Sequence, residues 1–173
     1  MSVFDEETRA LATAALDAAR ARGVMIVTAE SCTGGLVAGA LTSIAGSSDA
    51  VDGGTITYSN EAKVRLGVDA GLIERDGAVS EAVGRALAEA AATAGPPNAA
   101  SVAVTGVAGP GGGTALKPVG LVHIAASTSG RTLHRELRLG NIGRDAVRRD
   151  SVCAALRLLV ELLSEPGADH PAR

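Results

Sequence analysis

The sequence predicts a single domain over residues 1–173 of the α/β class, a three-layer α/β/α sandwich with a mixed, mostly parallel sheet. Three observations predict it. Segments with helical apolar spacing alternate with short β-branched segments along most of the chain, as in parallel strands joined by helices. Two further β-rich segments, 119–126 and 132–139, are separated by a short polar connection, as in an antiparallel hairpin. Finally, 46% of the 173 residues are apolar, which suffices for one buried core.

The N-terminal third is expected to contain a helix, a strand and a second helix. Apolar residues recur at helical spacing over 5–22, and Gly23 ends that helix. The short β-branched run 24–28 reads as a buried strand. The turn 29–35 then leads into an Ala-, Leu- and Val-rich helix that ends near Ile44.

The middle of the chain is expected to hold one strand and three helical segments. The run GTITY at 54–58 is β-branched and reads as a strand. A short helix begins at Asn60, and a further helical turn covers 69–75. An Ala-rich helix follows over 81–94, with Ser80 as its N-cap.

The last third is expected to place a glycine-rich loop between strands and to end in a long helix. In chain order we expect a strand at 101–105, a loop at 106–118, hairpin strands at 119–126 and 132–139, a helix at 143–163 and a disordered tail at 165–173.

Composition excludes several classes of protein. The net charge is −3, the aromatic content is 1% and no basic patch is visible, so a nucleic-acid partner is not expected. The acidic N-terminus does not resemble a signal peptide, and no apolar run is long enough to span a bilayer. We therefore expect a soluble cytoplasmic protein without a membrane partner. Ala- and Leu-rich chains often self-associate, so the sequence is also compatible with a homo-oligomer.

The cysteines and histidines give no pattern typical of metal binding. Cys32 and Cys153 are far apart in sequence and match no zinc or CxxC spacing, so we interpret them as reduced, partly buried thiols. The three histidines do not cluster at metal-ligand spacing either. We expect neither a metal nor an organic cofactor.

Three segments could carry chemistry. The first, ESCTGG at 30–35, is a turn between a strand and a helix, where backbone N–H groups and the helix dipole can hold an anion or an oxyanion. Ser31 and Thr33 would line such a site. An ordinary helix cap explains the same residues equally well.

The second segment combines Ser48, Tyr58 and Lys63. A serine hydroxyl needs a base to become a nucleophile, and a lysine whose pKa is lowered by burial can be that base. Tyr58 could relay the proton or hold the hydroxyl in place. Spacing alone favours a plainer interpretation, with Ser48 in a turn, Tyr58 in the core and Lys63 on a solvated helix face.

The third segment is the glycine-rich loop that begins at Thr105, after a buried strand. Ligands of open α/β folds bind at the carboxyl ends of strands, and unpaired N–H groups in such a loop can form an anion-binding nest. Arg144 and Arg148, four residues apart on the last helix, could clamp a phosphate or pair with neighbouring aspartates.

These segments together resemble the C-terminal domain of the CinA family of competence/damage-inducible proteins. The resemblance rests on TAESCTGGLVAGALTSIAGSS (28–48), GGTITYSNEAK (53–63), GAVSEAV (77–83), VTGVAGPGGG (104–113), KPVG (117–120) and GRDAVRR (143–149). It implies a three-layer fold and an amidohydrolase, nicotinamide-nucleotide amidase. Such an enzyme hydrolyses nicotinamide mononucleotide to nicotinic acid mononucleotide and ammonia, in pyridine nucleotide salvage. It also implies a stand-alone form, since longer members carry an additional N-terminal domain.

The resemblance implies two groups of site residues. The catalytic group comprises Ser48, Tyr58, Lys63 and Ser31, and the substrate-binding group comprises Glu30, Thr33, Gly34, Thr105, Gly106, Gly109, Arg144 and Arg148. Either serine could attack; we favour Ser48 slightly because it is nearer in sequence to Tyr58 and Lys63. The chain departs from the family at Gly111, where an aspartate is usual, and at 114–116.

The sequence is also compatible with a second class of function, a non-catalytic binding module. The same glycine turns could hold a nucleotide without chemistry, in a regulatory or sensor module of the same fold. Hydrolysis of a different amide or phosphorylated metabolite is a third hypothesis. Ammonia release from a panel of amides separates all three.

Overall fold

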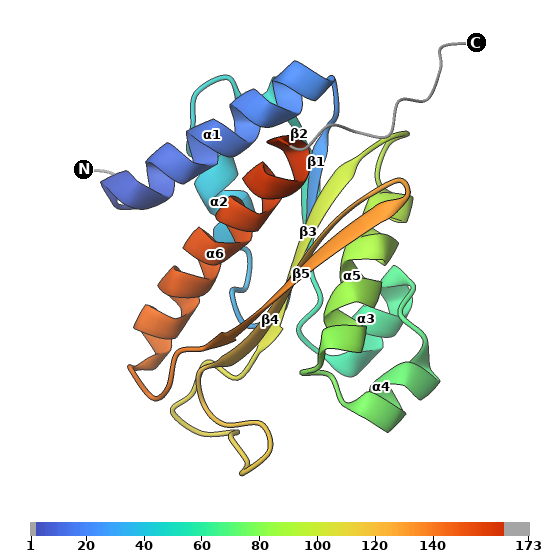
Figure 1. The fold of residues 1–173 in the computed structure, drawn as a ribbon, viewed down its shortest axis with the longest axis vertical. Helices are drawn as coiled ribbons and strands as arrows, with labels where there is room; N and C mark the ends of the chain where they lie inside the picture. The colour runs from blue at the N-terminus through green and yellow to red at the C-terminus, as the bar shows by residue number, and fades with distance from the viewer. Residues whose placement is uncertain (1–2, 165–173) are drawn as a thin grey trace.

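The computed structural model describes residues 3–164, which fold around one sheet (Figure 1). The predicted disordered tail 165–173 lies outside the described residues. In chain order the elements are α1 (Glu6–Arg22), β1 (Ile26–Glu30), α2 (Leu36–Thr42), the 3₁₀ helix η1 (Ser47–Asp49), β2 (Val51–Ile56), α3 (Asn60–Leu66), α4 (Ala70–Asp76), α5 (Glu81–Ala94), β3 (Ala100–Gly106), β4 (Leu121–Thr128), β5 (Arg131–Arg138) and α6 (Arg144–Ser164).

The sheet has five strands in the order β2-β1-β3-β4-β5. β1 pairs in parallel with both β2 and β3, whereas β4 runs antiparallel to its neighbours β3 and β5. Four strands therefore point the same way and only β4 is reversed. The predicted mixed, mostly parallel sheet is confirmed.

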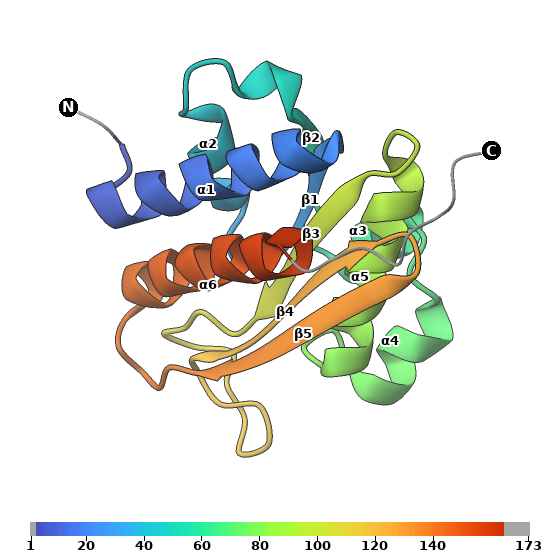
Figure 2. The ribbon, with the colours of Figure 1, turned by 45° about the horizontal axis from the view of Figure 1, so that its top comes forward.

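Helices cover both faces of this sheet, as Figures 1 and 2 show. α1, α2 and α6 lie on one face, with α1 and α6 side by side, and α3, α4 and α5 lie on the other. Side chains of successive strand residues point to opposite faces, so Ile26 joins the core under α1 and α6 while Val27 joins the core under α5. Both cores are built from Ala, Val, Leu and Ile, and the predicted three-layer fold is confirmed.

Four helices, α1, α3, α4 and α5, begin at a short polar side chain that caps them. Asp5, Ser59, Asp69 and Ser80 each accept a hydrogen bond from the backbone N–H three residues later. The prediction that Ser80 caps the helix of 81–94 is confirmed, since its hydroxyl accepts from Val83 at 3.3 Å. These caps leave few N–H groups of the first turns without an acceptor.

Several strand boundaries differ from the prediction by one to three residues, and β4, predicted at 119–126, spans Leu121–Thr128. β1 runs on to Glu30 rather than ending at residue 28, and β2 begins at Val51 rather than at Gly54. The sequence VDGG resembles a turn, yet Val51, Gly53 and Gly54 pair with β1, with a register shift at Asp52. A Cβ at Gly54 would lie 2.2 Å from the Thr28 hydroxyl, so the close approach of the two strands requires a glycine there.

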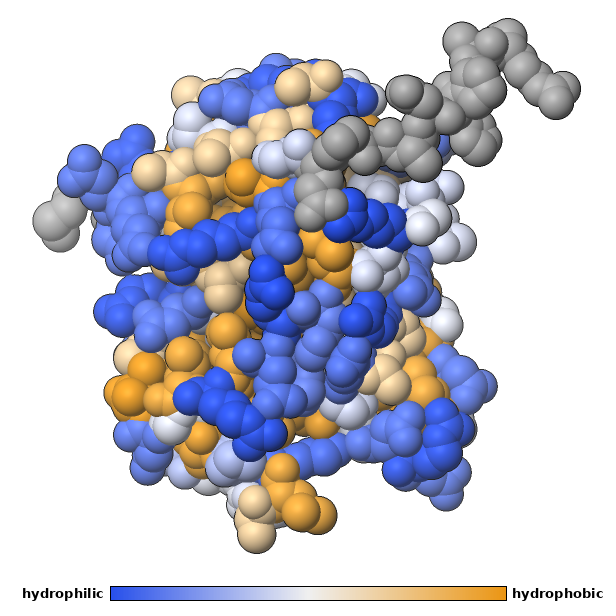
Figure 3. Space-filling model, viewed as in Figure 1, coloured by the Kyte–Doolittle hydropathy of each residue, from blue (hydrophilic) through white to orange (hydrophobic). Residues whose placement is uncertain are grey.

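The surface is mixed in character. Figure 3 shows hydrophilic and hydrophobic patches interleaved over the face of α1 and α6, and a small hydrophobic projection at the end where the β3–β4 loop lies. That loop contains Leu116, which is 88% exposed.

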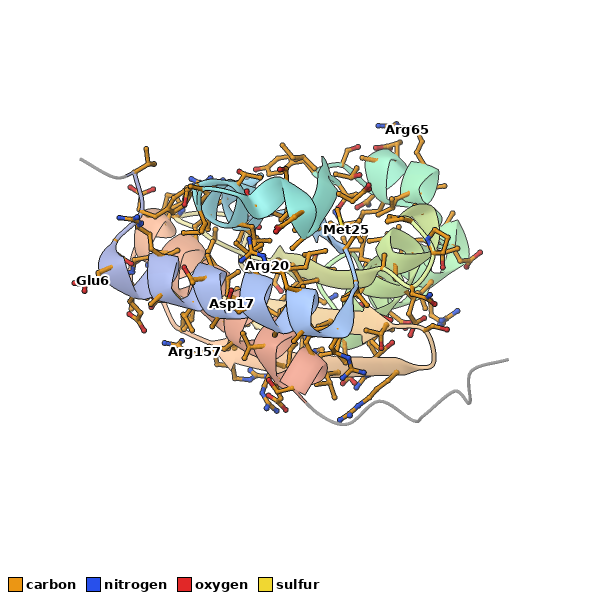
Figure 4. All side chains as sticks on the ribbon, turned by 90° about the horizontal axis from the view of Figure 1, so that it is seen from above. Glu6, Asp17, Arg20, Met25, Arg65 and Arg157 are labelled. Atoms are coloured by element: carbon orange, nitrogen blue, oxygen red, sulfur yellow. The ribbon has the colours of Figure 1, made fainter. Side chains whose placement is uncertain are left out.

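Figure 4 shows Asp17 next to Arg20 on α1, where they form an ion pair at 3.0 Å. Arg20 also binds Asp49 at 2.9 Å and so ties α1 to η1. Within residues 3–164, no helix is long and apolar enough to cross a membrane.

Candidate functional site

The chain reverses its direction of winding between β1 and β3. The connection from β1 to β2 passes through α2 on one face, and the connection from β2 to β3 passes through α3, α4 and α5 on the other. Such a switch point opens a crevice outside the carboxyl ends of the two strands, where open α/β folds bind ligands. A cavity of about 230 Å³ lies there, lined by Ser31, Cys32, Tyr58, Asn60, Lys63, Ala78, Val79, Thr105, Gly106, Ala108 and Arg144.

Lys63 points inward from α3 and is only 1% exposed. Its ammonium nitrogen Nζ lies 2.7 Å from the carbonyl oxygen of Thr57, 3.4 Å from that of Tyr58 and 3.3 Å from Ser31 Oγ. The plain interpretation of Lys63 as a solvated helix residue is therefore wrong. The lysine is a buried part of the cavity wall.

The burial of Lys63 makes its amine easier to deprotonate than that of an exposed lysine. Burial lowers the pKa of Lys63 below the usual value of a lysine, because a charged amine loses hydration there. No carboxylate among residues 3–164 forms an ion pair with it. Nζ donates all three of its hydrogen bonds, two to the carbonyls of Thr57 and Tyr58 and one to the hydroxyl of Ser31.

Ser31 is the first residue after β1 and is 9% exposed. Its backbone N–H donates to the carbonyl of Val104 on β3 at 2.9 Å, which continues the strand pairing by one residue. Its side chain therefore sits at the end of the crevice, within reach of Lys63. Of the two serines considered from the sequence, this is the one that the fold brings to the lysine.

Ser48 lies elsewhere, and the preference for it as the partner of Lys63 is wrong. Ser48 is exposed in η1, which precedes β2, whereas Tyr58 and Lys63 follow β2. The six residues of β2 separate the two ends by about 20 Å at roughly 3.3 Å per residue. Proximity in sequence is misleading here because an extended strand carries the chain across the domain.

Tyr58 lines the mouth of the cavity and is not a core residue, since 63% of it is exposed. Its backbone carbonyl accepts from Lys63, while its hydroxyl accepts from Arg144 at 3.4 Å. The predicted proton relay from Ser48 through Tyr58 to Lys63 is therefore wrong. The phenol is part of the entrance.

Glu30 is also placed differently from the prediction. It is 1% exposed, does not line the cavity, and its carboxylate accepts hydrogen bonds from the protein itself. The predicted role of Glu30 in binding substrate directly is wrong. A carboxylate whose oxygens are taken up by internal donors has no free face for a ligand.

The turn after Ser31 is held by an arginine. Arg148 on α6 donates to the carbonyl of Cys32 at 3.1 Å and to that of Thr33 at 3.2 Å. Arg148, Thr33 and Gly34 do not line the cavity, so their predicted contact with substrate is not brought about by the fold. The hydroxyl of Thr33 is fully buried, and within the described residues it has no hydrogen-bond partner.

The end of β3 and the loop after it form the opposite wall, where Thr105, Gly106 and Ala108 line the cavity. The hydroxyl of Thr105 donates to the carbonyl of Ala78 at 2.7 Å, which ties β3 to the segment before α5. Gly109 does not line the cavity; its carbonyl accepts from Arg144 at 2.9 Å. Arg144 is thus held between this loop and Tyr58 at the entrance.

Sequence reasoning missed five lining residues: Cys32, Asn60, Ala78, Val79 and Ala108. Ala78 and Val79 belong to GAVSEAV, one of the segments behind the family resemblance, which was the available signal. Burial raises the pKa of the Cys32 thiol to about 11. The thiol therefore stays protonated near neutral pH and is a poor nucleophile compared with a thiolate.

The described part of the chain offers no group of three metal-ligating side chains. His123 and His134 do lie together, with their ring nitrogens 3.0 Å apart, on the strands β4 and β5. Burial lowers the pKa of each imidazole, so both are neutral near pH 7. Neither histidine lines the cavity, whose basic side chains are Lys63 and Arg144.

Comparison with known proteins identifies the family. Residues 8–163 match the CinA C-terminal domain. A CinA-like protein of Gloeobacter violaceus is 49% identical over 160 residues, which are 90% of this chain and 36% of that protein. One of Mycobacterium marinum is 52% identical over 143 residues, 81% of this chain and 33% of that protein. The chain thus spans about a third of the length of these curated relatives.

Solved structures agree with this match. The competence/damage inducible protein CihA from Agrobacterium tumefaciens superposes with a TM-score of 0.91 at 47% identity, over 95% of this chain and all of that one (100%). A CinA superfamily protein from Klebsiella pneumoniae gives a TM-score of 0.84 at 36% identity, over 91% of this chain and 98% of the other. Since sequence and fold agree over nearly the whole described chain, this protein belongs to the CinA C-terminal domain family.

Proposed function

We propose that this protein is a serine amidohydrolase that removes ammonia from the carboxamide of nicotinamide mononucleotide. The proposal rests on one observation. A serine hydroxyl and a buried lysine amine lie 3.3 Å apart in a cavity at the switch point of the sheet. A nucleophile within reach of a base with a lowered pKa is the arrangement that covalent acyl transfer needs.

The proposed reaction has two halves. Ser31 Oγ attacks the carboxamide carbon and passes its proton to Lys63 Nζ. The tetrahedral intermediate collapses, Lys63 returns that proton to the leaving nitrogen, ammonia departs, and an ester to Ser31 remains. Water, deprotonated by Lys63, then attacks the ester carbon, and the ester bond to Ser31 breaks. Lys63 returns the proton to Ser31 Oγ as that bond breaks. The products are the carboxylic acid and the free serine, and the step needs no metal or organic cofactor.

The oxyanion of the intermediate needs donors near Ser31. The N–H of Ser31 itself already donates a hydrogen bond to the carbonyl of Val104. Within the described residues, the N–H group of Cys32, which follows Ser31 directly and lines the cavity, has no backbone acceptor. We assign the oxyanion to this group, since such a donor typically contributes on the order of 3 kcal/mol to the transition state.

The proposed function is tested by ammonia release from nicotinamide mononucleotide by the purified protein. We expect turnover by the wild type and essentially none by Lys63→Met, which keeps the buried aliphatic stem. Because only the neutral amine is a base, wild-type turnover should rise with pH through the lowered pKa of Lys63 and level off above it. Tight nucleotide binding without ammonia release by folded protein would instead support a non-catalytic nucleotide-binding module.

Arg144 is the proposed contact for the substrate phosphate, because it is the arginine that lines the entrance. Replacing Arg144 by Gln should raise KM for the mononucleotide roughly tenfold or more and leave kcat within a few-fold, since a charge-assisted bond is lost. The matched substrate is nicotinamide riboside, which lacks the phosphate and should respond little. An equal rise in KM for both substrates would contradict the assignment.

A further inference from the structure

We infer that Glu30 is a positioning residue that holds both halves of the Ser31–Lys63 pair in place. The inference rests on the proposed function and deepens it by naming the group that sets the geometry of the site. Four donors converge on the Glu30 carboxylate. They are the N–H groups of Gly35 at 3.0 Å, Val37 at 3.1 Å and Ala38 at 2.9 Å, and the hydroxyl of Thr28 at 3.2 Å.

The side chain of Glu30 orients the turn that carries Ser31. Gly35, Val37 and Ala38 form the start of α2, so the carboxylate binds the end of this helix back onto the strand that precedes Ser31. Residues 31–34 are thereby fastened at both ends. α2 has only seven residues, too few to be stable alone, and therefore depends on such an anchor.

The backbone of Glu30 orients Lys63. The carbonyl of Glu30 accepts from the N–H of Thr57 at 2.7 Å, and the carbonyl of Thr57 accepts from Lys63 Nζ at 2.7 Å. One residue thus connects to the serine through its side chain and to the lysine through its carbonyl. A shift of Glu30 would change the distance between the two reacting groups.

The surroundings of Glu30 are built to keep a carboxylate there. A buried charge is costly unless donors compensate it, and three backbone N–H groups with a hydroxyl do so. Gly54 leaves the space that the Thr28 hydroxyl occupies, since a Cβ there would lie 2.2 Å from it. Because the carboxylate fills the start of α2, that helix end is closed to the substrate phosphate.

The experiment compares Glu30→Gln with wild type in amide hydrolysis. The Gln side chain has the same size but replaces one acceptor oxygen by an NH₂ group, which faces N–H donors. We expect kcat to fall between tenfold and a hundredfold, as for a misplacement of about 1 Å, with KM within twofold because Glu30 does not line the cavity. The pH dependence should keep the midpoint set by Lys63, because Glu30 acts on position.

Asp5→Asn is the matched control. Asp5 caps α1 by accepting from the N–H of Thr8 at 2.8 Å and does not line the cavity. Because Asn caps a helix about as well as Asp, this variant should keep both kcat and thermal stability close to those of the wild type. Thr28→Val is the second variant, for use should Glu30→Gln not fold. It removes one donor from the carboxylate and should lower kcat several-fold in the same direction. Unchanged kcat in a folded Glu30→Gln or Thr28→Val variant would overturn the inference.

A second readout separates this inference from the proposed function. Covalent labelling of Ser31 by a fluorophosphonate, followed by intact-protein mass spectrometry, reports on the serine–lysine pair without any amide substrate. If wild type labels quickly but releases no ammonia, the proposed substrate is wrong, while slower labelling of Glu30→Gln still supports positioning. Equal labelling of wild type and Glu30→Gln would count against positioning, whether or not ammonia is released.

Discussion

Ser31→Ala is expected to lower kcat for amide hydrolysis by on the order of 10³-fold or more, whereas Ser48→Ala should leave kcat and KM within twofold. Ser31 Oγ lies 3.3 Å from Lys63 Nζ in the cavity, while Ser48 is exposed at the other end of β2. Removing a nucleophile abolishes the covalent route, and what remains comes from binding and oxyanion contacts alone.

Steady-state ammonia release by the two variants checks this expectation. Thermal unfolding should be similar for both, because each change removes one hydroxyl, so loss of folding would not explain a difference between them. Should Ser48→Ala lose activity while Ser31→Ala keeps it, the arrangement of the site around Lys63 would be wrong. Small, equal losses in both would eliminate a serine mechanism altogether.

Gly120→Ala is expected to destabilise the fold by about 3 to 5 kcal/mol, from backbone strain and overpacking together. Gly120 has φ +87°, and a Cβ there would lie 2.3 Å from the carbonyl oxygen of Gly140 and 2.4 Å from its nitrogen. Both are backbone atoms and cannot move aside as a side-chain tip would. Gly120 also accepts from the N–H of Leu139 and donates to Val107, so the clash lies where three segments meet.

Gly130→Ala is the matched control for this prediction. Gly130 has φ +93° in the β4–β5 turn, but a Cβ there would meet nothing within 4 Å. It should therefore cost only the conformational strain, about 1 to 2 kcal/mol. Urea unfolding of both variants gives the two free energies. Equal losses would mean that the contact with Gly140 is relieved by a small backbone shift.

Much of the fold follows from local sequence pattern. Alternating helical and β-branched segments, N-caps such as Ser80, and the hairpin of 119–139 are set by side-chain periodicity and short-range hydrogen bonds, which a single sequence displays. Strand ends follow less well, and β2 departs furthest from its prediction. The Gly-Gly pair in Val51–Ile56 resembles a turn, and only pairing with β1, where the Thr28 hydroxyl fills the space of a missing Cβ, makes it a strand.

The candidate site also combines features that the sequence predicts with features that only the tertiary structure decides. Sequence alone indicated which segments carry chemistry, because glycine turns that follow strands must gather at one edge of a parallel sheet, and it named Ser31, Lys63, Thr105 and Arg144 among them. It slightly favoured Ser48 over Ser31, which the fold contradicts, and it did not show that Glu30 and Arg148 bind the protein itself. Those outcomes depend on contacts between residues far apart along the chain, such as Lys63 with Ser31 and Arg148 with Cys32. Strand pairing and burial create these contacts, and both arise only once the whole domain has folded.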